Sequence, residues 1–230
     1  MPAHLLSMTE SAALAAAWTV YGVVHSALAA NPVKAAIMRR WPTLQRTYRA
    51  AFNALAVLLL IPPLALTHAL AGPPLWRWSG PLEWLSHAIA AIAMGTFLWT
   101  CRHYDMREFL GTAAWQEGGT LPPPLRLSPL HRFVRHPWYF LALLLIWTRD
   151  MDAARLIAAI IITAYFWIGS GFEERKLIET YGESYRRYRA RVGGLMPLPG
   201  RWLTRAEAAS IMGTPQNRGD TPFPPAGGGV

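Results

Sequence analysis

The chain has 230 residues, of which 53% are hydrophobic and only 15% are charged, against about 25% charged residues in a typical soluble domain. The mean hydropathy is +0.18 and the formal net charge is +9. This composition indicates a membrane protein. The one cysteine, Cys101, excludes an internal disulfide and a thiolate-rich metal cluster.

Apolar stretches divide the chain into five candidate helices, at residues 11–30, 50–71, 82–101, 138–148 and 153–172. Four of them approach the roughly 20 residues that one bilayer crossing needs. The stretch 138–148 is short, so it spans only if its helix begins near Leu130. Alternatively, it forms a tight hairpin with the next helix. We therefore expect an all-α integral membrane protein with about five transmembrane helices.

Basic residues are distributed unevenly around these stretches. Nineteen of the 22 lie in the segments that alternate stretches place on one side, and only Arg77, Arg149 and Arg155 lie on the other. The positive-inside rule then predicts an outside N-terminus and a cytoplasmic C-terminal segment, in a bacterial-type inner membrane. Topology and attraction to the lipid bilayer account for the net charge, and nothing indicates a nucleic-acid partner.

The segment 131–139 concentrates polar side chains just before the fourth apolar stretch. Pro137 suits the first turn of a helix, where its missing N–H is not needed. Such a helix start attracts an anionic group, and Arg135 and His136 add side-chain donors. Tyr139 lies three residues after His136 and shares its face. The alternative interpretation is an interfacial anchor of basic and aromatic residues.

Two adjacent carboxylates, Glu173 and Glu174, end the fifth apolar stretch. A carboxylate there opposes the helix dipole, so at least one should have a cationic partner. Adjacent helical residues point about 100° apart, which predicts that the two glutamates do not serve one site. Tyr165, Gly169 and Glu173 share a face, where glycine would leave room. The alternative is close helix packing at small residues, with the glutamates paired to nearby basic residues.

Other polar residues give weaker signals. His25 lies within the first apolar stretch, where a polar residue indicates either function or an interhelical hydrogen bond. The histidines His103, His131 and His136 are too few for a membrane di-iron centre, so we expect no metal. The catalytic base is not identified by any pattern.

The run R-H-P-W-Y at 135–139, followed from Glu173 by E-E-R-K-L-I-E-T-Y-G-E-S-Y-R-R-Y, resembles the signature of isoprenylcysteine carboxyl methyltransferases. The run G-V-V-H-S-A-L-A-A-N-P-V-K from Gly22, with D-M-R-E-F-L-G and F-W-I-G-S-G-F-E-E-R, is similar to NnrU proteins and, more closely, to bacterial methanethiol S-methyltransferases. Together the resemblance covers roughly residues 21–197.

This resemblance implies an enzyme that uses S-adenosylmethionine as methyl donor. His136, Pro137 and Tyr139 match the R-H-P-x-Y positions, and Glu173 matches the acidic cofactor ligand. The full set implied for the cofactor is Leu125, His131, Arg135, His136, Pro137, Tyr139 and Glu173, and the set expected near the acceptor is His25, Tyr165, Gly169 and Glu174.

The expected acceptor is a small or lipophilic thiol such as methanethiol. The carboxyl methyltransferases carry an arginine where this chain has Gly169, which favours an uncharged or small acceptor. A thiol also forms its anion more easily than an alcohol does. The alternatives are a carboxyl or lipid acceptor, a nicotinamide-dependent reductase of the same architecture, and a non-enzymatic NnrU-like accessory protein.

The resemblance also divides the chain. Residues 1–101 form an NnrU-like region of three membrane helices, and 102–129 form a cytoplasmic loop. Residues 130–200 hold the methyltransferase-like hairpin with its cofactor segment. Residues 201–230 form a short helix and a disordered tail. The oligomeric state is left open.

Overall fold

The computed structural model describes residues 6–103, 106–110 and 125–213. Residues 111–124 of the predicted cytoplasmic loop and residues 214–230 of the predicted disordered tail lie outside the described residues. The elements in chain order are α1 Met8–Ala29, α2 Asn31–Arg40, η1 Pro42–Arg46, α3 Tyr48–Ala69, β1 Pro74–Trp76, α4 Pro81–Cys101, α5 Met106–Leu110, η2 Pro129–Arg132, α6 Pro137–Trp147, β2 Met151–Asp152, α7 Ala153–Arg191 and α8 Arg205–Gly213.

Four helices, α1, α3, α4 and α7, are long and apolar enough to cross a bilayer, which confirms the expected all-α membrane fold. The fourth apolar stretch becomes α6, a helix of only 11 residues. At about 1.5 Å per residue it reaches roughly half of a 30 Å hydrocarbon core. Its helix begins at Pro137 and not near Leu130, so the hairpin alternative describes α6 and α7.

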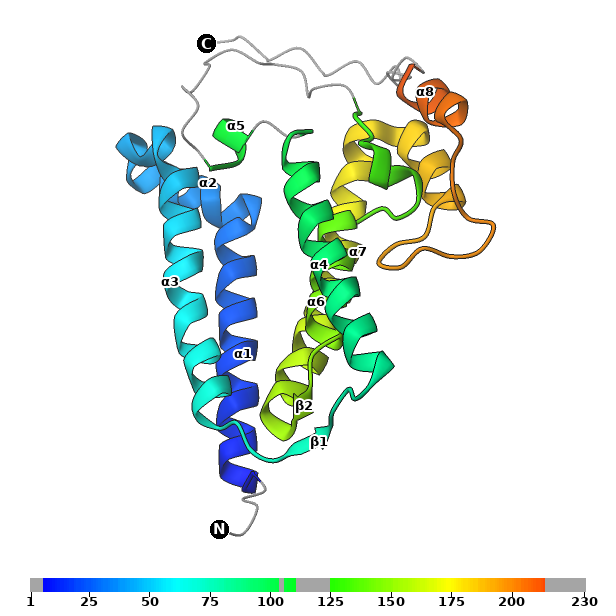
Figure 1. Ribbon diagram of the computed structural model, residues 1–230. Coiled ribbons are helices and arrows are strands. Elements are labelled where there is room, and N and C mark those ends of the chain that lie inside the picture. Colours follow the sequence, from blue (N-terminus) through cyan, green and yellow to red (C-terminus); the bar gives the residue numbers. More distant parts are fainter. Residues whose placement is uncertain (1–5, 104–105, 111–124, 214–230) are drawn as a thin grey trace.

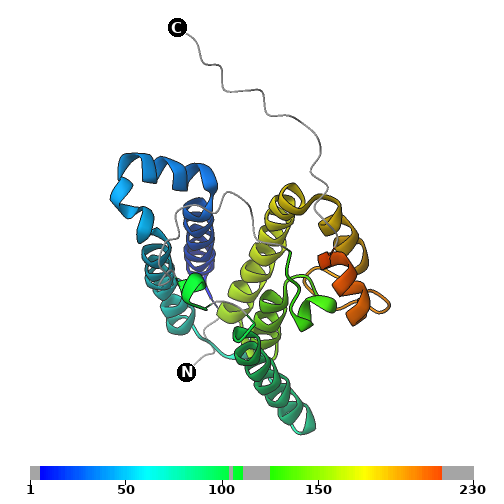
Figure 2. The same ribbon diagram turned by 90° about the horizontal axis from the view of Figure 1, so that it is seen from above.

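The helices form two groups that α7 joins (Figures 1 and 2). In one group α1 packs on α3 and on α7, and in the other α4 packs on α6. The interface of α1 with α7 buries Leu14 and Trp18 against Ala154 and Ala158. Small residues on α7 let the two backbones approach closely, as is usual between membrane helices.

A short antiparallel pair of strands closes one end of the bundle (Figure 1). β1 precedes α4, and β2 lies in the turn between α6 and α7, with Pro74 opposite Asp152. The Asp150 carboxylate strengthens this link by accepting a hydrogen bond of 3.1 Å from the Trp78 backbone N–H. The α6–α7 hairpin is thereby fixed to the start of α4.

At the other end, α7 bends and joins a small C-terminal core. Gly182 has φ +54°, a conformation that side-chain-bearing residues rarely adopt, and it separates the long apolar part of α7 from its last turns. After this bend Tyr185, Tyr188 and Val192 pack with Leu203 and Ala208 of the segment around α8. This core positions the residues that precede α6.

Candidate active site

The segment before α6 is clamped by the segment after α7. The backbone N–H of Arg135 donates to the Gly193 carbonyl at 2.8 Å, and that of His136 donates to the Gly194 carbonyl at 3.2 Å. A Cβ atom on Gly193 would collide with the Met196 carbonyl oxygen, so only glycine allows this close approach. Residues 58 positions apart in the chain therefore fix the start of α6.

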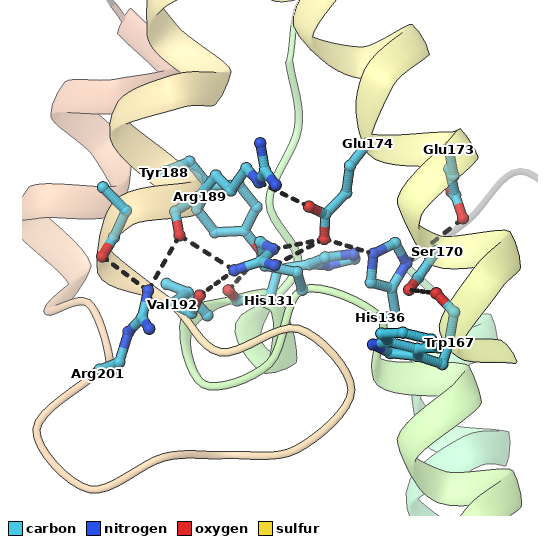
Figure 3. A network of polar contacts seen from close by, with 12 residues as sticks. His131, His136, Trp167, Ser170, Glu173, Glu174, Tyr188, Arg189, Val192 and Arg201 are labelled. Carbon is cyan, nitrogen blue, oxygen red and sulfur yellow. Dashed lines mark hydrogen bonds and ion pairs between the residues drawn. The ribbon is translucent and has the colours of Figure 1, made fainter. Parts of the chain in front are cut away.

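Glu174 lies at the centre of the polar cluster that this clamp creates (Figure 3). Its side chain is only 6% exposed. One carboxylate oxygen accepts from the Arg135 guanidinium at 2.7 and 2.8 Å and lies 3.0 Å from His136 Nε2. The other oxygen lies 2.9 Å from Arg189 Nε. The structure places Glu174 within α7, so it is the burial of this carboxylate that requires its cationic partners.

Arg135 is occupied by partners within the protein. Besides Glu174, its guanidinium donates to the backbone carbonyls of Arg189, at 3.0 Å, and of Val192. Arg135 was expected to hold the carboxylate of the cofactor, whereas here it fastens α7 to the start of α6. Sequence reasoning missed Arg189, since its role becomes visible only after the bend at Gly182 returns the chain to Glu174.

His136 joins the two glutamates, and the prediction that they do not serve one site is therefore wrong. Its Nε2 contacts Glu174, while its Nδ1 lies 3.4 Å from a Glu173 carboxylate oxygen. The two ring nitrogens point in different directions, so one buried imidazole can reach both side chains. Burial disfavours the imidazolium, but the hydrogen bonds and charges of Glu173 and Glu174 outweigh it and raise the pKa of His136 above its ordinary value.

Glu173 differs from Glu174 in its accessibility. Its side chain is 50% exposed, and the longer contact to His136 is its one ion pair among the described residues. Within the cluster, Glu173 is consequently the carboxylate that remains accessible to an external cation. This accessibility agrees with its expected role as cofactor ligand.

His131 and Leu125 occupy the edge of the cluster. The His131 Nδ1 lies 2.8 Å from the Ser128 hydroxyl and accepts from the Ser128 backbone N–H at 3.2 Å. Burial, followed by repulsion from His136, lowers the pKa of His131 to about 4. Leu125 packs against the C-terminal core. The cofactor contacts expected of His131 and Leu125 stay predictions.

Aromatic rings extend from His136 along α6 and α7. The His136 ring stacks on Tyr139 at a centroid distance of 5.4 Å, and Tyr139 stacks on Phe166 at 4.6 Å. Pro137 is buried and starts α6 directly after His136. The column offers π faces, which attract cations such as a sulfonium.

A second polar group lies where α1 meets α7. The Tyr165 hydroxyl is 2.9 Å from His25 Nδ1 and 3.0 Å from the Ser26 hydroxyl. The Tyr165 ring packs closely on Gly22, where an added Cβ would approach it to 3.0 Å. His25 and Tyr165, both expected near the acceptor, are therefore directly joined.

Gly169 leaves open space on the same face of α7. No atom would lie within 4 Å of a Cβ added there, so the alternative of close helix packing does not apply to this glycine. Tyr165, Gly169 and Glu173 follow one another at intervals of one helical turn. The face thus runs from the His25–Tyr165 contact, across an open position, to the accessible carboxylate.

Comparison with known proteins adds the family. A methanethiol S-methyltransferase from a Pseudomonas species, strain GM41, is 33% identical over 190 residues, which cover 78% of this chain and 70% of that relative. The chain belongs to the methanethiol S-methyltransferase family. Family members from Mycobacterium tuberculosis and Crocosphaera subtropica are 28% and 27% identical, and the matches cover 79% of this chain and 76% and 72% of theirs.

Membership in the methanethiol S-methyltransferase family confirms the closest resemblance seen in the sequence and makes the protein a membrane methyltransferase. The likeness to isoprenylcysteine carboxyl methyltransferases and NnrU proteins stays a prediction. No family model matches the chain, and no solved structure matches it.

Proposed function

We propose that the protein transfers the methyl group of S-adenosylmethionine to the sulfur of methanethiol or a similarly small thiol. The observation that carries the proposal is the open face of α7, where accessible Glu173 is followed by Gly169 and then by the Tyr165–His25 contact. Relatives named methanethiol S-methyltransferase support the same reaction.

The residues around Glu173 fit the donor. When bound, S-adenosylmethionine supplies an electrophilic methyl group on a sulfonium. Glu173 suits the cationic amino-acid end, since its carboxylate is half exposed and faces the start of α6. Tyr139 and Phe166 supply stacked aromatic faces beside it. Arg135 contributes indirectly, because it binds Glu174, which in turn contacts His136.

The acceptor side is small and nearly uncharged. Tyr165 brings a hydroxyl with two polar neighbours, His25 and Ser26, while Gly169 adds space and no charge. A carboxylate acceptor would find no arginine at position 169. A small thiol fits because it needs room for one methyl group and a path for one proton.

Transfer forms a bond between the thiol sulfur and the methyl carbon as the bond from that carbon to the donor sulfur breaks. The thiol must lose its proton, because the thiolate is the nucleophile. In our proposal the Tyr165 hydroxyl relays this proton to His25. Holding the acceptor in line with the methyl group and away from water would lower the entropic part of the barrier.

The two parts of the chain contribute differently in this proposal. Residues 130–200 bind the donor and add Tyr165 and Gly169 to the acceptor side, while residues 1–101 add His25 and Ser26 of α1. The donor site faces the cytoplasm of a bacterial-type inner membrane, as the uneven distribution of basic residues supports. A reporter enzyme fused to the C-terminus tests the orientation, which is contradicted if a periplasm-specific reporter becomes active.

The test is calorimetric binding of S-adenosylmethionine to detergent-purified protein, with turnover measured as dimethyl sulfide formed from methanethiol. Glu173→Gln should weaken donor binding about tenfold, since it removes a charge-assisted contact. Glu183→Gln is the matched control, because Glu183 is an exposed glutamate on the same helix paired only with Arg186 among the described residues. It should bind like the wild type.

Other results would change the proposal. Equal binding by wild type and Glu173→Gln would move the donor site elsewhere. If the protein binds the donor but methylates a carboxyl or amine acceptor of the panel and not methanethiol, that acceptor would replace the thiol in the proposal. No donor binding by the wild type would favour the accessory-protein alternative.

A further inference from the structure

A further polar site lies where α4 begins and where α6 turns into α7. Figure 1 shows this end of the bundle, with β1 and β2. A cavity of about 390 Å³ opens between the start of α4 and the turn from α6 to α7. This volume falls within the roughly 300–1,000 Å³ of small-molecule sites. The residues lining it are Glu83, Ser86, His87, Thr148, Arg149, Asp150 and Arg155.

Arg149 lines this cavity and has an unsatisfied hydrogen-bond donor. Its Nε is buried and has no hydrogen-bond partner in the part of the chain that the structure describes. Its Nη2 makes only long contacts, 3.3 Å to the Ser86 carbonyl and 3.4 Å to the Thr148 hydroxyl. Nε and Nη2 form the side of a guanidinium that binds two oxygens of a phosphate or carboxylate at once.

Arg155, the second arginine of the cavity, is paired differently. Its Nε lies 3.5 Å from the buried Asp152 carboxylate, and its Nη1 donates to the Asp150 carbonyl at 3.2 Å. No ion pair compensates Arg149 within residues 6–103, 106–110 and 125–213. A buried donor without an acceptor is costly, so an oxyanion in the cavity would satisfy Arg149.

The acidic lining residues restrict which anion fits. Glu83 and Asp150 line the same cavity and would repel a free dianion. They would attract a cationic group attached to the anion. The lining therefore matches a zwitterion, with its oxyanion on Arg149 and its ammonium toward Glu83 and Asp150.

The surroundings of the cavity are suited to a lipid. Leu82, Trp84 and Leu85, on the first turns of α4, are exposed, Trp84 to 78%. These residues lie at the start of a membrane-spanning helix, and tryptophan is common at the level of lipid headgroups. Acyl chains can lie on this apolar surface while the headgroup enters the cavity.

The distribution of the basic residues supports the same kind of ligand. Only Arg77, Arg149 and Arg155 lie on this side of the predicted topology, and two of the three line the cavity. Arginine is otherwise disfavoured on that side. From the unsatisfied Nε of Arg149, the acidic neighbours and the adjoining apolar surface, we propose that this cavity binds the phosphoethanolamine headgroup of a membrane phospholipid.

The test uses the full-length protein, delipidated in detergent and observed by native mass spectrometry. Phosphatidylethanolamine and phosphatidylglycerol with identical acyl chains are titrated, together with soluble phosphoethanolamine. Wild type should prefer phosphatidylethanolamine. Arg149→Gln should weaken its binding about tenfold, as expected for loss of a charge-assisted hydrogen bond. Arg77→Gln, at an exposed arginine on the same side but outside the lining, should bind like the wild type.

Glu83→Gln provides a second variant, since Glu83 is exposed and its substitution should not disturb folding. It should reduce the preference for phosphatidylethanolamine over phosphatidylglycerol. Unchanged phosphatidylethanolamine binding in both Arg149→Gln and Glu83→Gln would overturn the proposal. Equal binding of soluble phosphoethanolamine and of the lipid would overturn the lipid assignment and leave a site for a soluble zwitterion. The measurement is independent of methyl transfer.

Discussion

Arg135 and Glu174 form a buried ion pair that joins the start of α6 to α7, with both Nε and Nη2 of the guanidinium on one carboxylate oxygen, at 2.8 and 2.7 Å. The same carboxylate binds His136 and Arg189. The accessible neighbour, Glu173, contacts this group through His136. One glutamate thus stabilises the site and the other is available to a ligand.

Glu174→Gln should therefore destabilise the fold. It leaves Arg135, whose side chain is 12% exposed, without its carboxylate, and breaking a buried ion pair typically costs about 3–5 kcal/mol. We expect a clear decrease in the midpoint of thermal unfolding in detergent. Glu173→Gln should change that midpoint little, since the side chain is half exposed. Similar midpoints for the two variants would contradict the division of roles.

Gly193→Ala should disturb the same junction through the backbone. The added Cβ would collide with the Met196 carbonyl oxygen, and the strained segment would move away from Arg135. Such overpacking costs about 1–3 kcal/mol. Thermal unfolding and donor affinity should both decrease. Gly95→Ala is the control, because nothing lies within 4 Å of a Cβ there; an equal effect of both substitutions would refute the prediction.

Tyr165→Phe should affect the acceptor and spare the donor. It removes the hydroxyl that contacts His25 and Ser26 but keeps the ring on Gly22. We expect kcat/KM for methanethiol to fall about 100-fold or more, the range for loss of a side chain that transfers the proton, while donor affinity in calorimetry is unchanged. Tyr48→Phe removes another interhelical hydroxyl contact, to the Leu28 carbonyl, and serves as control. Equal losses in both variants would indicate a general packing effect.

His131 should make stability depend on pH. Its pKa is about 4 in the folded protein, below the value of about 6.5 in the unfolded chain. Between these values the unfolded chain binds the proton first, so the free energy of unfolding should fall as pH falls from about 6.5 toward 4. In His131→Asn, whose amide oxygen can still accept from Ser128, this slope should be reduced.

His136 should make stability depend on pH in the opposite direction to His131. Its folded pKa is raised, so its contribution is fully present below about pH 6.5 and is lost as pH rises through the folded value. His136→Asn should flatten the decrease of stability on the alkaline side and leave the acidic side intact. Chemical unfolding at several pH values measures both slopes, and a variant with the wild-type profile would reject its assignment.

Much of the architecture could be predicted from the chain. Long apolar runs produce α1, α3, α4 and α7, because only helices satisfy the backbone within lipid. Pro137 determined where α6 begins and hence that α6 is short. The pairing of Arg135 with Glu174 could not be read from spacing, because residues 39 positions apart meet only after two helices fold against each other.

The sequence by itself therefore determined the membrane class, the helices, the candidate residues and the resemblance to a methyltransferase family, since these depend on local composition and on motif spacing. Only the tertiary structure decided the division of labour between Glu173 and Glu174, the internal use of Arg135, and the contact of His25 with Tyr165. Each of these depends on burial and on which side chains meet across helices. Both are set by packing, which no local pattern of residues encodes.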